Sequence, residues 1–252
     1  MIRHSALAAV LAVTSTSIVA AQAPAPVVQA KVRLLAFTEE LCKPEIYAHD
    51  PTAAADIPGI KAEIKSYLNH QGYTVATRSK KVVFTTKPDH ASISRQGELI
   101  GEASLPTTSN SAIMIFLPGK PGDKAANLMM AVDDSKRAFP PGSFHITNIS
   151  PKNVRLKLEK TQYDFTPGKT LLITDPPIGE NHQAGMETFV QNGNAWSRVS
   201  AGYWPIPKST RNLAIIYQHP ATGRITLNGF DDVPPSDAPA PAASSASTQS
   251  TR

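Results

Sequence analysis

Residues 143–174 read SFHITNISPKNVRLKLEKTQYDFTPGKTLLIT, and their pattern decides the fold class. Phe144 and Ile146 alternate with His145 and Thr147, which is the two-residue period of a half-buried strand. Turn-forming residues at 150–153 end this run, and residues 154–158 then alternate apolar with charged side chains. After a further turn at 167–168 the alternation resumes, so the stretch predicts an antiparallel meander of strands.

The same two-residue period recurs along most of the chain. It predicts further strands at residues 31–38, 60–66, 73–75, 81–86, 98–105, 112–117, 126–132, 186–191, 194–204, 212–218 and 224–228. The run at 112–117 is continuously apolar and should be a central strand covered on both faces. The 60–66 run also fits a helix face, but its neighbours favour a strand. Residues 39–58, with three prolines, are predicted to be an irregular connection.

These strands indicate an all-β protein, a mainly antiparallel β-sandwich built either as one large unit or as two immunoglobulin-like halves. Residues 1–21 resemble a secretory signal peptide and residues 22–30 a linker. We expect β-sandwich halves at 31–118 and 123–233, separated by the Pro- and Gly-rich turn at 118–122. Residues 234–252 should form a disordered tail rich in Pro, Ala and Ser.

Charge and cysteine content restrict the possible partners. The formal net charge is +5, and the basic residues are scattered rather than clustered, which argues against nucleic-acid binding. Cys42 is the single cysteine, so the chain forms no internal disulfide, and we interpret this residue as a small apolar filler. The signal predicts export to the periplasm or the extracellular space, with no membrane span once the signal is removed.

No strong catalytic motif stands out. The histidines lack the close spacing of metal ligands, so no metal or cofactor is predicted. The pairs Asp133-Asp134 and Asp231-Asp232 should point to opposite faces and mark strand ends. The weak catalytic candidates are therefore Glu180, His182 and Glu187, which lie in or beside a polar loop.

Aromatic residues suggest a binding surface near the end of the chain. Tyr203 and Trp204 are adjacent, so one of them should face outward if the segment is extended, and they are the candidate binding residues. Trp196 is predicted to point inward. The loop at 39–58 offers Glu45, His49 and Asp50 as further candidates, although carboxylates and a histidine in an exposed loop are usually just solvated.

The order of strands and turns in residues 143–174 resembles that of secreted bacterial immunoglobulin-like and pilus-chaperone-like sandwiches. The later pattern around Trp196, Tyr203-Trp204, Arg211 and Gly223-Arg224 looks like exported β-sandwich proteins without an assigned activity. The leading hypothesis is an exported, non-enzymatic binding or envelope-structural protein with a protein or glycan partner. The alternatives are a hydrolase of cell-wall or extracellular polymer, and a pilus-type periplasmic chaperone with a long uncovered edge strand.

Overall fold

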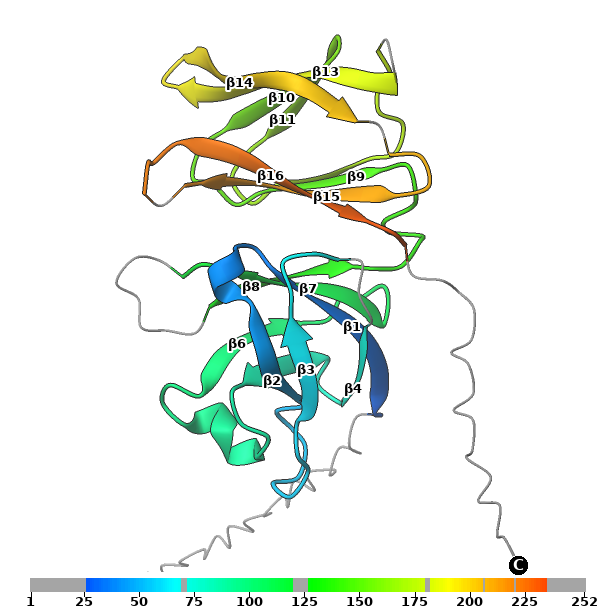
Figure 1. The fold of residues 1–252 in the computed structure, drawn as a ribbon, viewed down its shortest axis with the longest axis vertical. Coiled ribbons are helices and arrows are strands. Elements are labelled where there is room, and N and C mark those ends of the chain that lie inside the picture. Colours follow the sequence, from blue (N-terminus) through cyan, green and yellow to red (C-terminus); the bar gives the residue numbers. More distant parts are fainter. Residues whose placement is uncertain are drawn as a thin grey trace, which may run out of the picture.

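The computed structural model describes residues 26–68, 72–119, 127–179, 182–205, 207–219 and 221–234. Within these ranges the chain forms four sheets of four strands each, and the prediction of an all-β, mainly antiparallel fold is confirmed (Figure 1). The proposed signal peptide lies outside the described residues, as does the tail beyond Pro234. Among the described residues, no helix is long and apolar enough to cross a membrane.

The strands follow one another with few interruptions. The first eight are β1 (Val28–Ala36), β2 (Lys43–His49), β3 (Ile60–Ile64), β4 (Tyr73–Thr77), β5 (Lys81–Thr85), β6 (Leu99–Ser104), β7 (Ser111–Leu117) and β8 (Leu128–Asp133). The second eight are β9 (Phe144–Asn148), β10 (Val154–Leu158), β11 (Thr161–Phe165), β12 (Thr170–Ile173), β13 (Gln183–Asn192), β14 (Ala195–Pro205), β15 (Arg211–Gln218) and β16 (Ile225–Asp232). Short 3-10 turns occupy Glu39–Leu41 and His90–Ser94.

The four sheets stack as layers (Figure 1). Sheet A has the strand order β4-β1-β7-β8 and packs on sheet B, β3-β2-β5-β6, around a first apolar core. Sheet C, β12-β9-β15-β16, packs on sheet D, β11-β10-β13-β14, around a second core. The outer faces of sheets A and C then pack on each other around a third core, so both of these sheets are buried on both sides.

The central strand β7 shows how the sequence supports this stacking. Met114 and Phe116 point into the core between sheets A and B, whereas Ile113, Ile115 and Leu117 point into the core between sheets A and C. All five are buried, which confirms that the continuous apolar run at 112–117 is a strand covered on both faces.

The two sandwiches repeat one topology. Adding eight to each strand number of sheets A and B gives the strand orders of sheets C and D. The parallel pairing of β1 with β7 is matched by that of β9 with β15. The registers make Asp134 equivalent to Asp232, and Arg33 equivalent to His145. The chain is therefore a tandem repeat at the level of structure.

The predicted meander at 143–174 is wrong in its connectivity, although all of its strands exist. β10 and β11 form an antiparallel hairpin in sheet D, while β9 and β12 pair with each other in sheet C. Phe144 and Val154 nevertheless face the same core from opposite sheets. Alternation reveals which side of a strand is apolar, but it does not reveal which strand lies beside it.

The irregular connection predicted at 39–58 is also corrected, because β2 occupies Lys43–His49 and lies between β3 and β5. Pro44 sits near its start, where the register with β3 shifts between Lys43 and Ile46, and a bulge tolerates the missing N–H. The strand predicted at 60–66 is confirmed as β3. Most of the turn predicted at 118–122 lies outside the described residues. β8, which comes after it in the sequence, pairs with β7 in sheet A, and the chain passes to sheet C only at residues 134–143.

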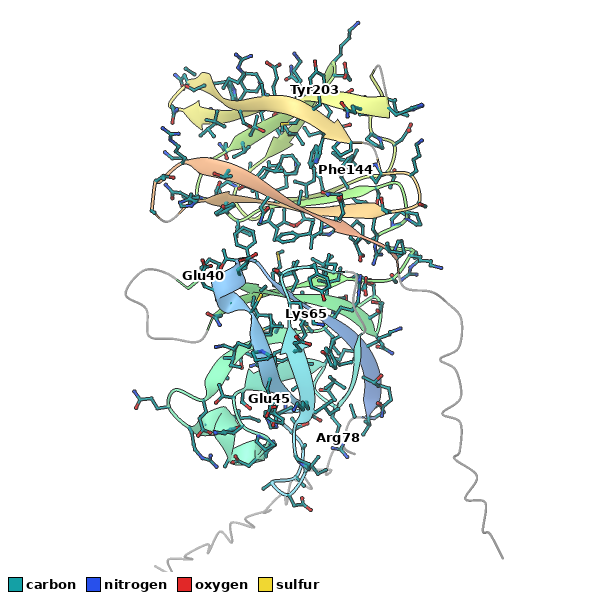
Figure 2. The ribbon with its side chains drawn as sticks, viewed as in Figure 1. Glu40, Glu45, Lys65, Arg78, Phe144 and Tyr203 are labelled. Carbon is teal, nitrogen blue, oxygen red and sulfur yellow. The ribbon has the colours of Figure 1, made fainter. Side chains whose placement is uncertain are left out.

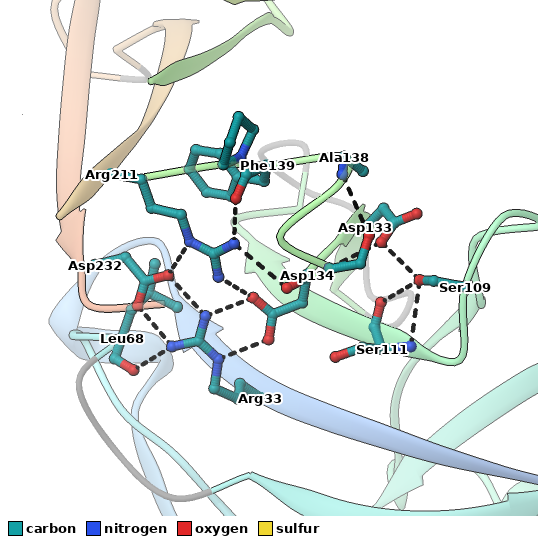
Figure 3. Close-up of polar contacts among 12 residues, drawn as sticks. Arg33, Leu68, Ser109, Ser111, Asp133, Asp134, Ala138, Phe139, Arg211 and Asp232 are labelled. Atoms are coloured by element: carbon teal, nitrogen blue, oxygen red, sulfur yellow. Dashed lines mark hydrogen bonds and ion pairs between the residues drawn. The ribbon is translucent and has the colours of Figure 1, made fainter. Parts of the chain in front are cut away.

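A buried ionic cluster joins the two sandwiches beside the third core (Figure 3). Arg33, from β1, donates to both carboxylate oxygens of Asp134 at 2.8 and 2.6 Å and to both of Asp232 at 2.6 and 2.7 Å. Arg211, at the start of β15, donates to Asp232 at 2.8 Å, to the carboxylate of Asp134, and to the carbonyl oxygen of Phe139 at 2.6 Å. Two cations and two anions thus balance in a site closed to water.

The two carboxylates of the cluster raise the pKa of Arg33. Burial by itself lowers the pKa of Arg33, but hydrogen bonds and charge attraction from Asp232 and Asp134 outweigh it, and the net direction is upward. The side chains of Arg211 and Asp232 are fully inaccessible. A buried ion pair of this kind tolerates the loss of one partner poorly, because the remaining charge has no water to solvate it.

The cluster gives the first prediction. We expect Arg211→Met to lower the free energy of unfolding by about 3–5 kcal/mol, because it leaves two buried carboxylates facing one guanidinium. Urea denaturation followed by circular dichroism measures this change. Arg155→Met removes an exposed ion pair with Asp164 and serves as the matched control, with only a small expected effect. Equal effects of the two substitutions would contradict the role assigned to the cluster.

A second prediction concerns His145, which packs 5.5 Å from the ring of Phe139. Burial, with a smaller contribution from the charge of Arg211, lowers the pKa of His145 to about 4. The unfolded chain therefore takes up this proton first as the pH falls. Stability should be retained above about pH 6.5 and decrease by up to about 3 kcal/mol as the pH falls toward 4.

Urea denaturation between pH 7 and pH 4 tests this dependence. His145→Gln should flatten the slope, whereas His182→Gln, at an exposed position, should leave it unchanged. The pKa of His49 is lowered as well, chiefly by burial, so part of the slope should persist in the His145 variant. An unaltered slope in His145→Gln would show that another group controls it.

Candidate binding surface

The catalytic candidates do not assemble into an acid–base site within the described residues. Glu180 lies outside those residues. His182 is exposed and begins the segment that leads into β13. Glu187 lies in the middle of β13, where its carboxylate accepts hydrogen bonds from Arg198 at 2.8 Å and from Lys157 at 3.1 Å. Glu187 is thus occupied by two cations.

The binding candidates Tyr203 and Trp204 point to opposite sides of β14, as adjacent residues of a strand must. Trp204 is only 8% exposed and stacks on Phe144 at 4.5 Å in the core between sheets C and D. Tyr203 is 78% exposed and projects from the outer face of sheet D (Figure 2). Only Tyr203 is therefore available to a partner.

We use the name outer face for the solvent-exposed side of sheet D. It is formed by Arg155, Lys157, Glu187, Trp196, Arg198 and Tyr203. Trp196 lies here rather than inside, contrary to the prediction, because Val199 is an extra residue in β14 that shifts its register with β13 between Thr188 and Phe189.

The charged residues of the outer face form ion pairs with one another or with Asp164, and one of them, Arg155, also stacks on an aromatic ring. Arg155 donates two hydrogen bonds to Asp164, at 2.6 and 3.0 Å, and these raise its pKa. The guanidinium carbon of Arg155 lies 4.2 Å from the centre of the Trp196 ring. Hydrogen bonds from Arg198 and Lys157 lower the pKa of Glu187. Every one of these charges is held in place, which suits recognition better than proton transfer.

Two hollows in the surface could also hold a ligand. One, of about 260 Å³, lies at the far end of the first sandwich and is lined by His49, Asp50, Arg78 and His90, among apolar side chains. The other, of about 760 Å³, is an apolar groove between the sandwiches, lined by Phe37, Ile149, Tyr217 and neighbouring residues. Of the loop candidates, His49 and Asp50 line the first hollow, whereas Glu45 pairs with Lys61 on the surface.

Most polar groups that line the smaller hollow have partners, although the buried Nδ1 of His49 has none among the described residues. Asp50 accepts hydrogen bonds from the N–H groups of Thr52 and Arg78, both at 3.0 Å, which lower its pKa against the opposing effect of burial. Thr85 donates to the carbonyl oxygen of Lys87 and accepts from Ser92, so the 2.8 Å contact with His49 Nε2 requires the imidazole to donate. These groups hold the loop in shape.

Metal binding finds no support in the described ranges, which contain no group of three or more His, Cys, Asp or Glu side chains able to hold an ion. The sequence reasoning missed the ionic cluster. Its aspartates had been interpreted as strand-end residues, and its arginines lie in alternating strands that resemble ordinary solvated faces. The repeated Asp-Asp pair at equivalent strand ends was the available signal.

Comparison with known proteins leaves the family open. No protein-family model and no curated protein sequence matches the chain. A solved structure from Parabacteroides distasonis, whose given name refers to cell adhesion, aligns over 82% of this chain and 97% of its own, with 8% identity and a TM-score of 0.14. That score is too low to carry an argument about fold or function.

The third prediction tests where the two tryptophans lie. The variant Trp204→Phe keeps only Trp196. Acrylamide should quench its fluorescence readily, because the Trp196 ring lies on the outer face. Trp196→Phe leaves the buried Trp204, which should be quenched several-fold less. Stern–Volmer measurements on the two variants check this order. Comparable quenching would contradict the assignment of one ring to the surface and the other to the core.

Proposed function

We propose that the protein is an exported, non-enzymatic binding module of the cell envelope, and that it recognises a protein partner through the outer face. The observation that carries this proposal is that the exposed Tyr203 and the Arg155–Trp196 stack lie on the same face of sheet D. Tyrosine, tryptophan and arginine are the residue types that dominate binding energy in protein interfaces. The expected signal peptide supports export.

The stacked sandwiches favour a static role for the rest of the chain. Sheets A and C are buried on both faces and locked by the ionic cluster, so the outer face is carried on a rigid support. A rigid support lowers the entropy lost when a partner binds. The ion pairs of Glu187 and Arg155 hold the recognition groups in one arrangement and leave none of them as a free acid or base.

The pilus-type chaperone remains a second candidate on one observation. That function requires a long uncovered edge strand, and β14, with 11 residues, lies at the edge of sheet D. The hydrolase alternative has no comparable support, since Glu187 is engaged by two cations.

The fourth prediction measures binding of the purified mature protein to envelope preparations of the producing cells by co-sedimentation. We expect saturable binding that the double variant Trp196→Ala/Tyr203→Ala weakens roughly tenfold or more. Tyr67→Ala removes an exposed ring from the first sandwich and should leave binding unchanged. Equal binding by the double variant and the wild type would refute the outer face as the recognition surface.

Protease treatment of the envelopes separates the two kinds of partner. Loss of binding after proteolysis supports a protein partner. Binding that survives proteolysis but is lost after glycan digestion would overturn the protein assignment in favour of a glycan. Circular dichroism of each variant verifies that the sheets are intact.

A further inference from the structure

Because the two sandwiches repeat one topology, the same side can be compared in both. This is the side where the last strand of each sheet lies at the edge, β6 and β8 in the first sandwich and β14 and β16 in the second. In the first sandwich the edge strands β6 and β8 contact each other and close that side. The N–H of Asn127, next to β8, donates to the carbonyl oxygen of Ile100 in β6 at 2.8 Å. Gly101 of β6 lies so close to Met129 of β8 that a Cβ there would come within 2.7 Å of the sulfur. This side is full.

The equivalent side of the second sandwich is open. β14 and β16 take the places of β6 and β8, but no comparable contact joins them, and Figure 1 shows them apart. Gly202 points to the same side of β14 as the buried Trp204, yet a Cβ at Gly202 would meet nothing within 4 Å. Across the opening, Ile225 and Leu227 of β16 are only partly buried against the core.

The backbone of β14 is free on the same side. The carbonyl oxygen of Gly185, in β13, accepts from the N–H of Glu159 at 2.7 Å, and its own N–H donates to the Glu159 carboxylate, so both groups turn away from β14. Tyr203, paired with Gly185, therefore also turns its N–H and carbonyl away from β13, and Ala201, two residues back, does the same. These groups point to the open edge.

Of the features that protect an edge strand, β14 has a bulge at Val199 and a proline, Pro205, at its end, but neither falls within residues 200–204. It has 11 residues, and its one charged side chain, Arg198, is paired with Glu187 on the outer face. The edge strand β3 has five residues, including Lys61 and Glu63, and Lys65 follows it directly. Short length and charge discourage pairing at β3, whereas β14 presents a long, nearly uncharged ladder.

The chemistry of this opening selects its occupant. A row of alternating backbone N–H and carbonyl groups is satisfied in full only by another extended polypeptide. The space beside Gly202 lies on the side of β14 that faces the core, against which Leu227 of β16 is partly buried, so it accepts an apolar side chain. The next residue of an added strand would face solvent on the side of Tyr203. A partner segment with apolar residues at every second position fits both requirements.

We infer that the partner donates an extended segment, with apolar side chains at alternate positions, which pairs with β14 and fills the open side of the second sandwich. This inference rests on the proposed binding function and specifies how the partner is held. The bound segment closes the side of the second sandwich between β14 and β16, as the direct contact of β6 with β8 closes that side of the first sandwich.

A display library of random linear nonapeptides, selected on the full mature chain, tests the inference. Selected sequences should share apolar residues at alternate positions, and a labelled synthetic copy provides the affinity by fluorescence polarisation. Ala201→Pro removes an outward N–H without touching the β13–β14 ladder, and should weaken binding at least tenfold. Ala201→Thr keeps the N–H and should retain binding.

Other outcomes overturn the inference. Selected peptides without alternation, or peptides that bind Ala201→Pro as well as the wild type, would exclude strand addition at β14. A dimer in sedimentation equilibrium that Ala201→Pro abolishes would assign the edge to a second copy of this chain instead. If Ala201→Pro proves unstable, N-methylation of alternate peptide residues makes the same test on the wild type, and unchanged affinity of the methylated peptides would refute the inference.

The two proposals fail separately. If no alternating peptide binds but Trp196→Ala/Tyr203→Ala still weakens envelope binding, the outer face remains the recognition surface and only strand addition is excluded. If the double variant binds envelopes normally, the proposed function itself fails.

Discussion

The arrangement of the whole molecule depends on a charge-balanced cluster of two arginines and two aspartates buried between the sandwiches. Arg33 comes from the first strand, Asp134 follows β8, and Arg211 and Asp232 belong to the last hairpin. Each sandwich contributes one cation and one anion. If sheets A and C separated, these charges would lose their partners. The cluster therefore favours a single orientation of sheet A on sheet C within the apolar packing of the third core.

The structural repeat explains why the cluster contains two arginines and two aspartates. Asp134 and Asp232 occupy equivalent positions, as do Arg33 and His145. Two guanidinium groups already neutralise the two carboxylates, so a third cation at the interface would be uncompensated. His145 fits because burial and the neighbouring Arg211 keep its imidazole neutral. Of the two equivalent positions, the one in the first sandwich thus holds the charged Arg33, and the one in the second sandwich holds His145 in its neutral form.

Local alternation predicted nearly every strand, since burial of one face imposes a two-residue period whatever the neighbours are. It did not predict β2, where Pro44 resembled a loop, or the transfer of the chain between sheets after β9. The alternation within residues 31–38 does not identify Arg33 as buried, because nothing local shows that sheet A is covered on its second face. The partners of Glu187 lie 30 and 11 residues away in sequence, so its ion pairs follow from strand register, which alternation alone does not supply.

The residue types in β14 explain why this side of the second sandwich is open. The positions of β14 on the side of the core are Ala195, Ser197, Ser200, Gly202 and Trp204, and only the last is buried. In β6 the corresponding side carries Ile100, which belongs to the first core. Small and polar residues let β14 remain in contact with water without an adhesive apolar patch, while the missing side-chain volume leaves room beside the core. A strand built in this way is stable without a partner and still able to accept one, which is the combination that reversible recognition requires.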